Sequence, residues 1–211
     1  NVTDLYHAGA YGWQHKDWIE RNADEYEYRV YNDMGFWFHG DNKSVPIIID
    51  YLEWDHVSYQ EFFYKNSKWH TLTPELAISL YEPYVSWITN YLKTEIPNAK
   101  HYFYQHWSWQ VGHSTVPDVA TQTEMFEGIR GATHYLAEQN DVTLIPCGEA
   151  WQLARANPLI GDTMCKDDYL HDSGATGGQY LNGCVFYEVM FQKSCIGDTW
   201  RANTVLSEEK H

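Results

Sequence analysis

Hydrophobic and polar positions recur along the chain at two spacings, and each spacing predicts a different kind of element. Helical spacing and helix-start signals predict helices over 44–54, 73–97, 118–140, 149–157 and 177–192. The clearest helical stripe, within 73–97, includes Leu76, Leu80 and Tyr84. Thr73 precedes this stripe as a capping residue, and Pro83 inside it predicts a kink or a break.

Short apolar or alternating runs predict strands over 2–9, 55–60, 99–109 and 142–148. Residues 16–31 begin with helical spacing and then alternate, and "NDMG" (32–35) predicts a turn after them. Strands therefore alternate with helices of crossover length, which is typical of a parallel sheet with helices on both faces. The predicted fold class is α/β.

Composition narrows the classes of partner. The chain has 211 residues, 44% of them hydrophobic, which suits one globular domain. Lys and Arg number 14 against 29 Asp and Glu, a formal net charge of −15, and no basic stripe is present. Nucleic acids and anionic membrane surfaces are therefore not expected as partners. No apolar run approaches the roughly 20 residues that a membrane span needs.

The cysteines and two glycosylation sequons suggest a location for the protein. Four cysteines, none in a CxxC pair, accompany the triplets Asn1-Val2-Thr3 and Asn42-Lys43-Ser44. Together they favour a secreted or extracellular glycoprotein with one or two disulfides. Cys184 and Cys195 are not expected to pair if one helix continues between them, because they would then lie roughly 16 Å apart.

Metal and cysteine chemistry receive little support. His101, His106 and His113 cluster near the end of one predicted strand, but metal ligands need converging geometry and supporting partners. No motif supports Cys147 or Cys165 as a nucleophile, and a disulfide or a buried thiol is the favoured interpretation of each. Neither a metal ion nor a cofactor is therefore expected.

The stretch "KDDYLHDSG" (166–174) contains the strongest candidate for chemistry. Asp168 stands three residues before His171, so its carboxylate can turn back and accept the Nδ1–H of the imidazole. That arrangement would leave Nε2 free as a general base. The alternative is a solvated loop that enters the last helix, with Asp172 or Ser173 as its cap. Other polar strand-end segments, such as "QHWSWQ" (105–110), favour the acid–base interpretation.

Several segments resemble one protein family. "DDYLHDSGATGGQYLNGCVFYEVMF" resembles the final block of the SGNH (GDSL-type) hydrolases, where Asp-x-x-His precedes the last helix. "AGAYGWQHKDW", "WDHVSYQE", "PNAKHYFYQHWSWQ" and "VTLIPCGEAWQLAR" are similar to further blocks of a bacterial-type branch of SGNH-like proteins. The resemblance covers nearly all 211 residues. It implies a flavodoxin-like three-layer sandwich with a central parallel sheet.

The resemblance also implies roles for individual residues. Asp168 and His171 would be the catalytic acid and base. The backbone N–H of Gly9 and the side-chain amide of Gln60 would hold the oxyanion. Trp107, Trp109 and Tyr11 would bind the substrate. The alternatives are a turn glycine at Gly9, an ordinary strand-end residue at Gln60, and core packing for the tryptophans.

The chain departs from the family pattern at its start. The first block, Gly-Asp/Asn-Ser, holds the nucleophilic serine, and no serine of this chain has that context. Ser58 would share a strand face with Gln60 but follows no glycine turn. In the strand order 2-1-3-4-5 the missing first strand would lie between the second and third, and unpaired buried backbone is costly. An upstream segment or a partner chain is therefore expected to supply that strand and the serine. Residues 1–211 would then form one domain that is partial at both ends.

Two functions remain open from the sequence. The first is an ester hydrolase that removes acyl groups from a carbohydrate, with an ester or glycan substrate and a serine from outside this chain. The second is a non-catalytic structural or glycan- or protein-binding member of the fold, within a heteromer or filament. Paired catalytic carboxylates at Asp167 and Asp168 are disfavoured, because adjacent residues on an extended loop point apart.

Overall fold

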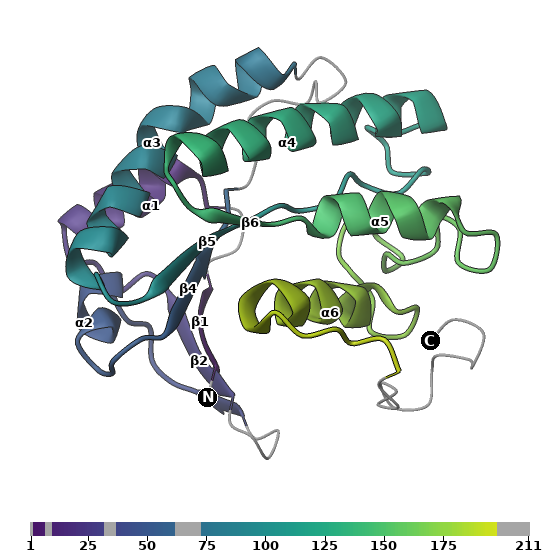
Figure 1. The fold of residues 1–211 in the computed structure, drawn as a ribbon. Helices are drawn as coiled ribbons and strands as arrows, with labels where there is room; N and C mark the ends of the chain where they lie inside the picture. Colours follow the sequence, from purple (N-terminus) through teal and green to yellow (C-terminus); the bar gives the residue numbers. More distant parts are fainter. Residues whose placement is uncertain (1, 7–9, 32–36, 62–72, 198–211) are drawn as a thin grey trace. The chain divides into compact units, whose positions relative to one another are not determined.

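Six strands and six helices follow one another in the computed structural model, which describes residues 2–6, 10–31, 37–61 and 73–197 (Figure 1). The strands are β1 (Val2–Tyr6), β2 (Glu27–Tyr31), β3 (Trp37–His39), β4 (His56–Tyr59), β5 (Lys100–Tyr104) and β6 (Thr143–Ile145). The helices are α1 (Gly12–Glu20), α2 (Val45–Ile49), α3 (Pro74–Glu95), α4 (Val119–Gln139), α5 (Cys147–Ala156) and α6 (Gly178–Phe191).

The chain divides into two compact units. The first unit contains β1, β2, β3, α1 and α2, together with Tyr81–His101. The second contains Ser58–Gln60, the described residues 73–80 at the start of α3, and the described chain from Tyr102 onward, with α4, α5, α6 and β6. The expected single domain over residues 1–211 stays a prediction.

The first unit contains an antiparallel sheet in the order β1-β2-β3. In the register of this sheet, the backbone of Arg29 in β2 lies opposite Asp4 of β1 on one side and opposite His39 of β3 on the other. The sequence predicted a strand over 2–9 and an alternating stretch up to residue 31, and it predicted parallel strands, which is wrong for this antiparallel sheet. Alternating apolar residues predict a strand but not its direction. Asn22, with a left-handed φ of 51°, follows α1 where the chain turns towards β2.

Helix-start signals in the sequence correspond to caps in the structure. The Ser44 side chain accepts the N–H of Ile47 and caps α2. The Thr73 hydroxyl accepts the N–H of Leu76 at the start of α3. Helix α3 continues through Pro83, so of the two predicted alternatives the break is wrong and the kink stays a prediction. A proline removes one backbone hydrogen bond, and the remaining bonds of this 22-residue helix hold it together.

The other sheet has the order β4-β5-β6, and β5 and β6 pair in parallel. Tyr102 and Ile145 of this sheet pack against Phe186 and other apolar residues of α6. Gln105, next to β5, points to the other face and donates to Thr133 Oγ1 of α4 at 2.8 Å. Because strand residues alternate between faces, one helix covers each face. This is the expected α/β three-layer arrangement with a central parallel sheet.

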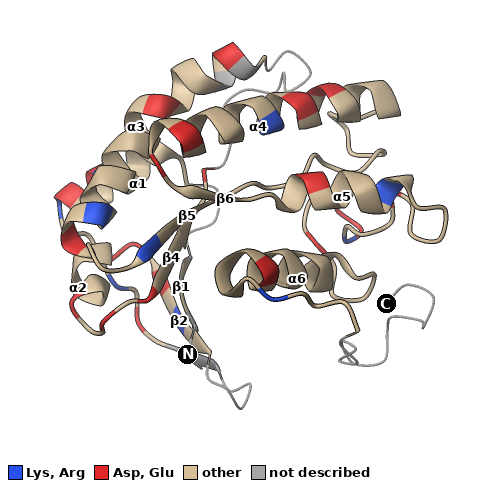
Figure 2. Ribbon diagram, viewed as in Figure 1, with Lys and Arg blue, Asp and Glu red and all other residues tan. Residues whose placement is uncertain are grey.

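Helix α4 has a buried face and a charged exposed face. Met125, Ile129 and Leu136 are fully buried, at the spacing of one helical stripe. Its exposed positions include three glutamates and one arginine, in keeping with the acidic character of the chain (Figure 2). Among the helices that the structure describes, none combines the length and apolar character that crossing a bilayer requires.

Candidate functional site

The loop before α6 brings Asp168 and His171 together. His171 Nδ1 lies 2.8 Å from Asp168 Oδ2. The other carboxylate oxygen, Oδ1, accepts the backbone N–H groups of Leu170 and His171, each at 2.9 Å. The three-residue spacing therefore produces the contact predicted from it. The catalytic role of the pair stays a prediction.

The ionisation of Asp168 follows from these contacts. Desolvation is the largest single influence and raises the pKa of Asp168, but the hydrogen bonds oppose it. The imidazole of His171 and the backbone N–H groups of Leu170 and His171 together lower the pKa to about 2. The carboxylate is therefore charged at neutral pH and favours an Nδ1–H tautomer of His171, in which Nε2 can accept a proton.

The alternative of a helix cap is wrong for this loop. The N-cap of α6 is Gly177, with φ 95°, and no side chain caps it. The Ser173 hydroxyl accepts the N–H of Ala175 instead. Asp172 accepts from the side chain of Asn182 at 3.0 Å.

The segment that follows β5 holds this loop from one side. Trp107 Nε1 donates to the carbonyl of Leu170 at 3.0 Å, and the N–H of Gln110 donates to the carbonyl of Tyr169 at 2.9 Å. Tyr169 has a left-handed φ of 61°, and its ring would meet a Cβ added at Gly112 at 3.1 Å. Such backbone strain in a tyrosine persists only where surrounding contacts hold it.

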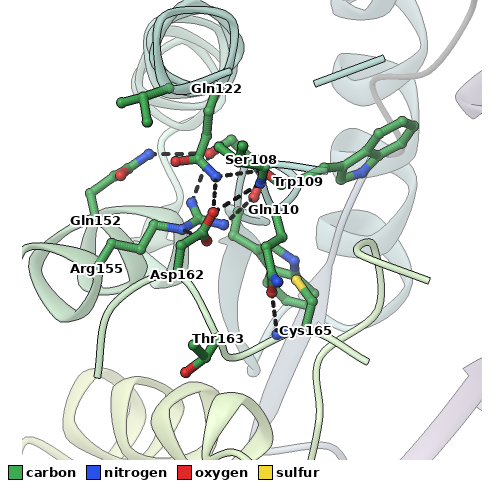
Figure 3. Close-up of polar contacts among 12 residues, drawn as sticks. Ser108, Trp109, Gln110, Gln122, Gln152, Arg155, Asp162, Thr163 and Cys165 are labelled. Atoms are coloured by element: carbon green, nitrogen blue, oxygen red, sulfur yellow. Dashed lines mark hydrogen bonds and ion pairs between the residues drawn. The ribbon is translucent and has the colours of Figure 1, made fainter. Parts of the chain in front are cut away.

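Arg155 of α5 fixes the same segment after β5 (Figure 3). Its guanidinium donates to Asp162 Oδ1 at 2.7 Å, to Ser108 Oγ at 2.8 Å and to the Ser108 carbonyl at 2.7 Å. Gln152 Nε2 also donates to Ser108 Oγ, at 3.1 Å. The Arg155 side chain is only 6% exposed, so this planar fork is a buried anchor.

Asp162 connects this anchor to α4. Its second carboxylate oxygen accepts the N–H of Val111 and the side-chain amide of Gln122, each at 2.9 Å. The same Gln122 amide donates to the Trp109 carbonyl at 2.8 Å (Figure 3). These polar contacts satisfy backbone groups of a segment that belongs to no helix or strand.

Sequence reasoning missed the residues of this anchor. Gln122 lies on the buried stripe of α4, where a polar residue among apolar ones is a signal for a buried hydrogen bond. The contact between Arg155 and Asp162 could not be predicted from the sequence, because it depends on the conformation of the turn between them.

A second set of contacts joins α5, α6 and the loop. Trp151 Nε1 of α5 donates to Asn182 Oδ1 of α6 at 2.8 Å, and Asn182 in turn donates to Asp172. The Trp151 ring stacks on Trp107, with ring centroids 4.4 Å apart. The loop that carries His171 is thus tied to two helices and to the segment after β5.

The remaining predicted site residues lie in varied surroundings. Gln60 directly follows β4 and is exposed, so its amide is available to a ligand. Gly9 lies outside the described residues. Tyr11 is half-buried, and its N–H donates to the side chain of Gln14 at the start of α1. Within the described ranges, no hydrogen bond joins Gln60 to His171.

The two tryptophans pack in the interior. Trp109 is 4% exposed, which leaves no free ring face for a sugar, so the structure corrects its assignment as a substrate-binding residue. Trp107 is half-buried and packs against the apolar cluster of Trp151, so its stacked face is occupied too. The burial of both tryptophans agrees with the alternative interpretation, in which their rings pack in the core.

In the described part of the chain, no serine or cysteine side chain forms a hydrogen bond with the His171 imidazole. Ser58 on β4 is exposed, as is Gln60 two residues later. Cys147 and Cys165 are buried, and burial raises the pKa of both thiols, to about 12 for Cys165. Buried thiols with a raised pKa are poor nucleophiles.

The three histidines that cluster in the sequence bond to separate partners. His101 bonds to the Ile96 carbonyl, His106 to the Trp107 carbonyl and His113 to Thr115 Oγ1. Across residues 2–6, 10–31, 37–61 and 73–197, no group of three or more His, Cys, Asp or Glu side chains is arranged to hold a metal ion.

The two sequons differ in what the structure describes. Asn42 is exposed, whereas Asn1 lies outside the described residues. Ser44, the third residue of the second sequon, is fully buried and donates to the side chain of Asn22. All four cysteines are thiols in this structure.

The fold and site define an α/β protein with a carboxylate–imidazole pair in the loop before its last helix. The chain belongs to the DUF4886 family, a domain of unknown function, whose profile matches residues 1–211. A crystal structure of a DUF4886 family protein from Bacteroides uniformis has the same fold, with a TM-score of 0.79 and 20% identity. The match covers 94% of this chain and 74% of that one.

One further solved structure is similar over a smaller part of the chain. It is described as a "putative GDSL-like lipase" from Parabacteroides merdae, with 19% identity and a TM-score of 0.45. The match covers 64% of this chain and 61% of that one. No curated protein matches this chain.

Proposed function

We propose that the protein is an SGNH-like ester hydrolase that removes acyl groups from a carbohydrate, with Asp168 and His171 as its acid–base pair. The observation that supports this best is the 2.8 Å contact between His171 Nδ1 and Asp168 Oδ2. It is the orientation that a general base needs, with one ring nitrogen held and the other able to accept a proton.

In this proposal the nucleophile is a serine from outside the 211 residues, on an upstream segment or a partner chain. His171 Nε2 takes the proton of that serine as its oxygen attacks the ester carbonyl. The same nitrogen then returns the proton to the leaving alcohol. Asp168 keeps the imidazole oriented and stabilises the imidazolium. The N–H of Gly9 and the amide of Gln60 hold the oxyanion.

The anchors around the loop support the proposal physically. Both side chains of the pair are substantially exposed, 45% for Asp168 and 59% for His171. The pair therefore depends on its backbone for position. Trp107, Gln110 and Asn182 provide that position through hydrogen bonds to the loop.

The test uses the full-length protein together with any copurifying chain. Ester hydrolysis is measured on p-nitrophenyl acetate and on an acetylated oligosaccharide. Asp168→Asn and His171→Ala are each expected to lower kcat/KM by about 10²–10⁴-fold. Asp167→Asn is the matched control, since it removes the same charge from the next residue, and it is expected to leave kcat/KM within about twofold of wild type.

A fluorophosphonate probe identifies the nucleophile in the same preparation. The labelled peptide is expected to contain a serine outside residues 1–211. Unimpaired hydrolysis by His171→Ala would contradict the proposed base. Absence of both labelling and hydrolysis in the full-length protein would favour the non-catalytic binding alternative. Within the described residues, His171 Nε2 has no hydrogen-bond partner, and this observation is compatible with that alternative as well.

A further inference from the structure

The chain that follows α6 turns back onto that helix. Gln192 ends α6 in a left-handed conformation, with φ 55°, and its N–H donates to the Glu188 carbonyl. The Glu188 carboxylate then accepts from the Ser194 hydroxyl at 3.1 Å and from the Cys195 N–H at 2.9 Å. One carboxylate therefore fixes residues 194 and 195 against the last turns of the helix.

This reversal brings the thiols of Cys184 and Cys195 together. Cys195 Sγ lies 3.5 Å from Glu188 Oε1, and the Cys184 thiol is near enough to raise the pKa of Cys195. Cys184 and Glu188 are four residues apart on α6, so they share one face of the helix. The separation of about 16 Å was expected only if one helix continued through both cysteines, and that condition is not met, because α6 ends at Phe191.

We propose that Cys184 and Cys195 are a redox-active pair that forms a reversible disulfide. The bond would covalently tie the segment after α6 to the helix. Both side chains are partly exposed, so a small oxidant can reach them. Cys147 and Cys165 are buried, and their thiols lie 3.9 Å from the carbonyl oxygens of Asn182 and Leu170, so they remain reduced. This inference does not depend on the proposed hydrolase activity.

The oxidant in the proposal is a small-molecule disulfide such as oxidised glutathione. The Cys184 thiolate attacks one of its sulfur atoms, forms a mixed disulfide and releases one glutathione thiolate. Cys195 then loses its proton to solvent and attacks the Cys184 sulfur, which releases the second glutathione thiolate. Two protein thiols are oxidised, and one small-molecule disulfide is reduced to two thiols.

The surroundings assign the order of attack. Partial burial, the Cys184 thiol and the Glu188 carboxylate raise the pKa of Cys195 to about 12. Cys195 is therefore seldom a thiolate at neutral pH, and it acts second, once a mixed disulfide lies beside it. The Glu188 carboxylate that positions Cys195 thus also keeps it protonated until then.

The positions of lysine and arginine allow a direct test. Trypsin cuts after Lys166, Lys193 and Arg201, so residues 167–193 contain only Cys184 and residues 194–201 contain only Cys195. The folded protein is equilibrated in glutathione buffers of graded redox potential, quenched with a thiol-alkylating reagent under denaturing conditions, and digested without reduction. A linked 167–193/194–201 peptide is expected to appear as the buffer becomes oxidising. It should disappear again on reduction.

Matched variants separate this pair from the other thiols. Cys184→Ser and Cys195→Ser are each expected to abolish the linked peptide, whereas Cys165→Ala leaves it. Glu188→Ala removes the anchor of residues 194 and 195, and should lower the equilibrium constant for disulfide formation against glutathione several-fold. If both peptides stay fully alkylated in oxidised glutathione alone, or if either cysteine links to Cys147 or Cys165 instead, the proposal is overturned.

Discussion

Asp168 shows how a four-residue turn can set the ionisation of one side chain. Its two oxygens accept from the imidazole of His171 and from two backbone N–H groups. The pKa falls to about 2 although the side chain is nearly half exposed. Local hydrogen bonds, rather than a buried site, therefore keep this carboxylate charged.

Removing the imidazole should reverse part of that effect, because the two backbone hydrogen bonds remain. In His171→Ala the pKa of Asp168 is expected to rise from about 2 towards its ordinary value of 3.8. Carbon-detected NMR titration of the carboxyl groups measures the change. Asp118, whose pKa is lowered by hydrogen bonds from Thr121, is the internal control and should not respond.

The same shift predicts a pH dependence of stability. Because the folded pKa of Asp168 lies below the unfolded one, its contribution is fully present above about pH 4 and is lost as the pH falls towards 2. Wild type should therefore lose more stability across this window than His171→Ala does. Equal losses in chemical denaturation at pH 5 and pH 2.5 would contradict this sign.

Gly112 offers a second prediction at the residue scale. Its φ of 110° disfavours any residue with a Cβ, and an added Cβ would press on the Tyr169 ring at 3.1 Å. Gly112→Ala should lower the free energy of unfolding by about 1–3 kcal/mol. Gly183→Ala on α6 is the control, because an added Cβ there would meet no atom within 4 Å, and it should raise the free energy of unfolding by about 0.5–1 kcal/mol.

The boundaries of helix α4 were predicted more accurately from the sequence than those of strand β5. Helix α4 was expected over 118–140 and extends from Val119 to Gln139, because its buried stripe and the Asp118 cap are local signals. Strand β5 was expected over 99–109 but ends at Tyr104. Beyond Tyr104 the alternation of polar and apolar residues continues through Ser108 and Trp109. The backbone carbonyls of these two residues, however, accept hydrogen bonds from the side chains of Arg155 and Gln122 rather than from a neighbouring strand.

The candidate site was predictable where it is local and missed where it is not. Asp168 and His171 are three residues apart, so their contact depends on one turn. The anchor of Arg155, Asp162 and Gln122 joins a helix, a loop and another helix, and only folding brings these residues together. Likewise, the approach of Cys195 to Cys184 depends on the left-handed conformation of Gln192. A glycine at that position would have indicated such a turn in the sequence, but a glutamine does not.

The Arg155 anchor gives a prediction at the scale of elements. Arg155→Ala removes the hydrogen bonds to Asp162 Oδ1 and to the carbonyl and hydroxyl of Ser108, and should lower the free energy of unfolding by about 3 kcal/mol. Arg130→Ala is the control, since that side chain is 49% exposed and lies 3.6 Å from its acidic partners, and it should cost less than about 1 kcal/mol. Equal effects of the two variants in denaturant titrations would contradict a buried anchor.

Over the whole molecule, acidic side chains dominate the charge. With a net charge of −15 at pH 7 and an isoelectric point near 5.0, the chain should bind an anion exchanger at neutral pH. Its solubility should be lowest near pH 5. In filter-binding assays at about 150 mM salt, duplex DNA should not be retained. Salt-sensitive retention would contradict the exclusion of nucleic-acid partners.

The two compact units are interleaved along the chain. Helix α3 contributes residues up to Leu80 to one unit and residues from Tyr81 to the other, and both β4 and β5 are divided in the same way. No single cut in the gene could therefore excise one unit intact, and no single recombination event could transfer it to another protein. Fusion or truncation boundaries therefore belong outside this whole region.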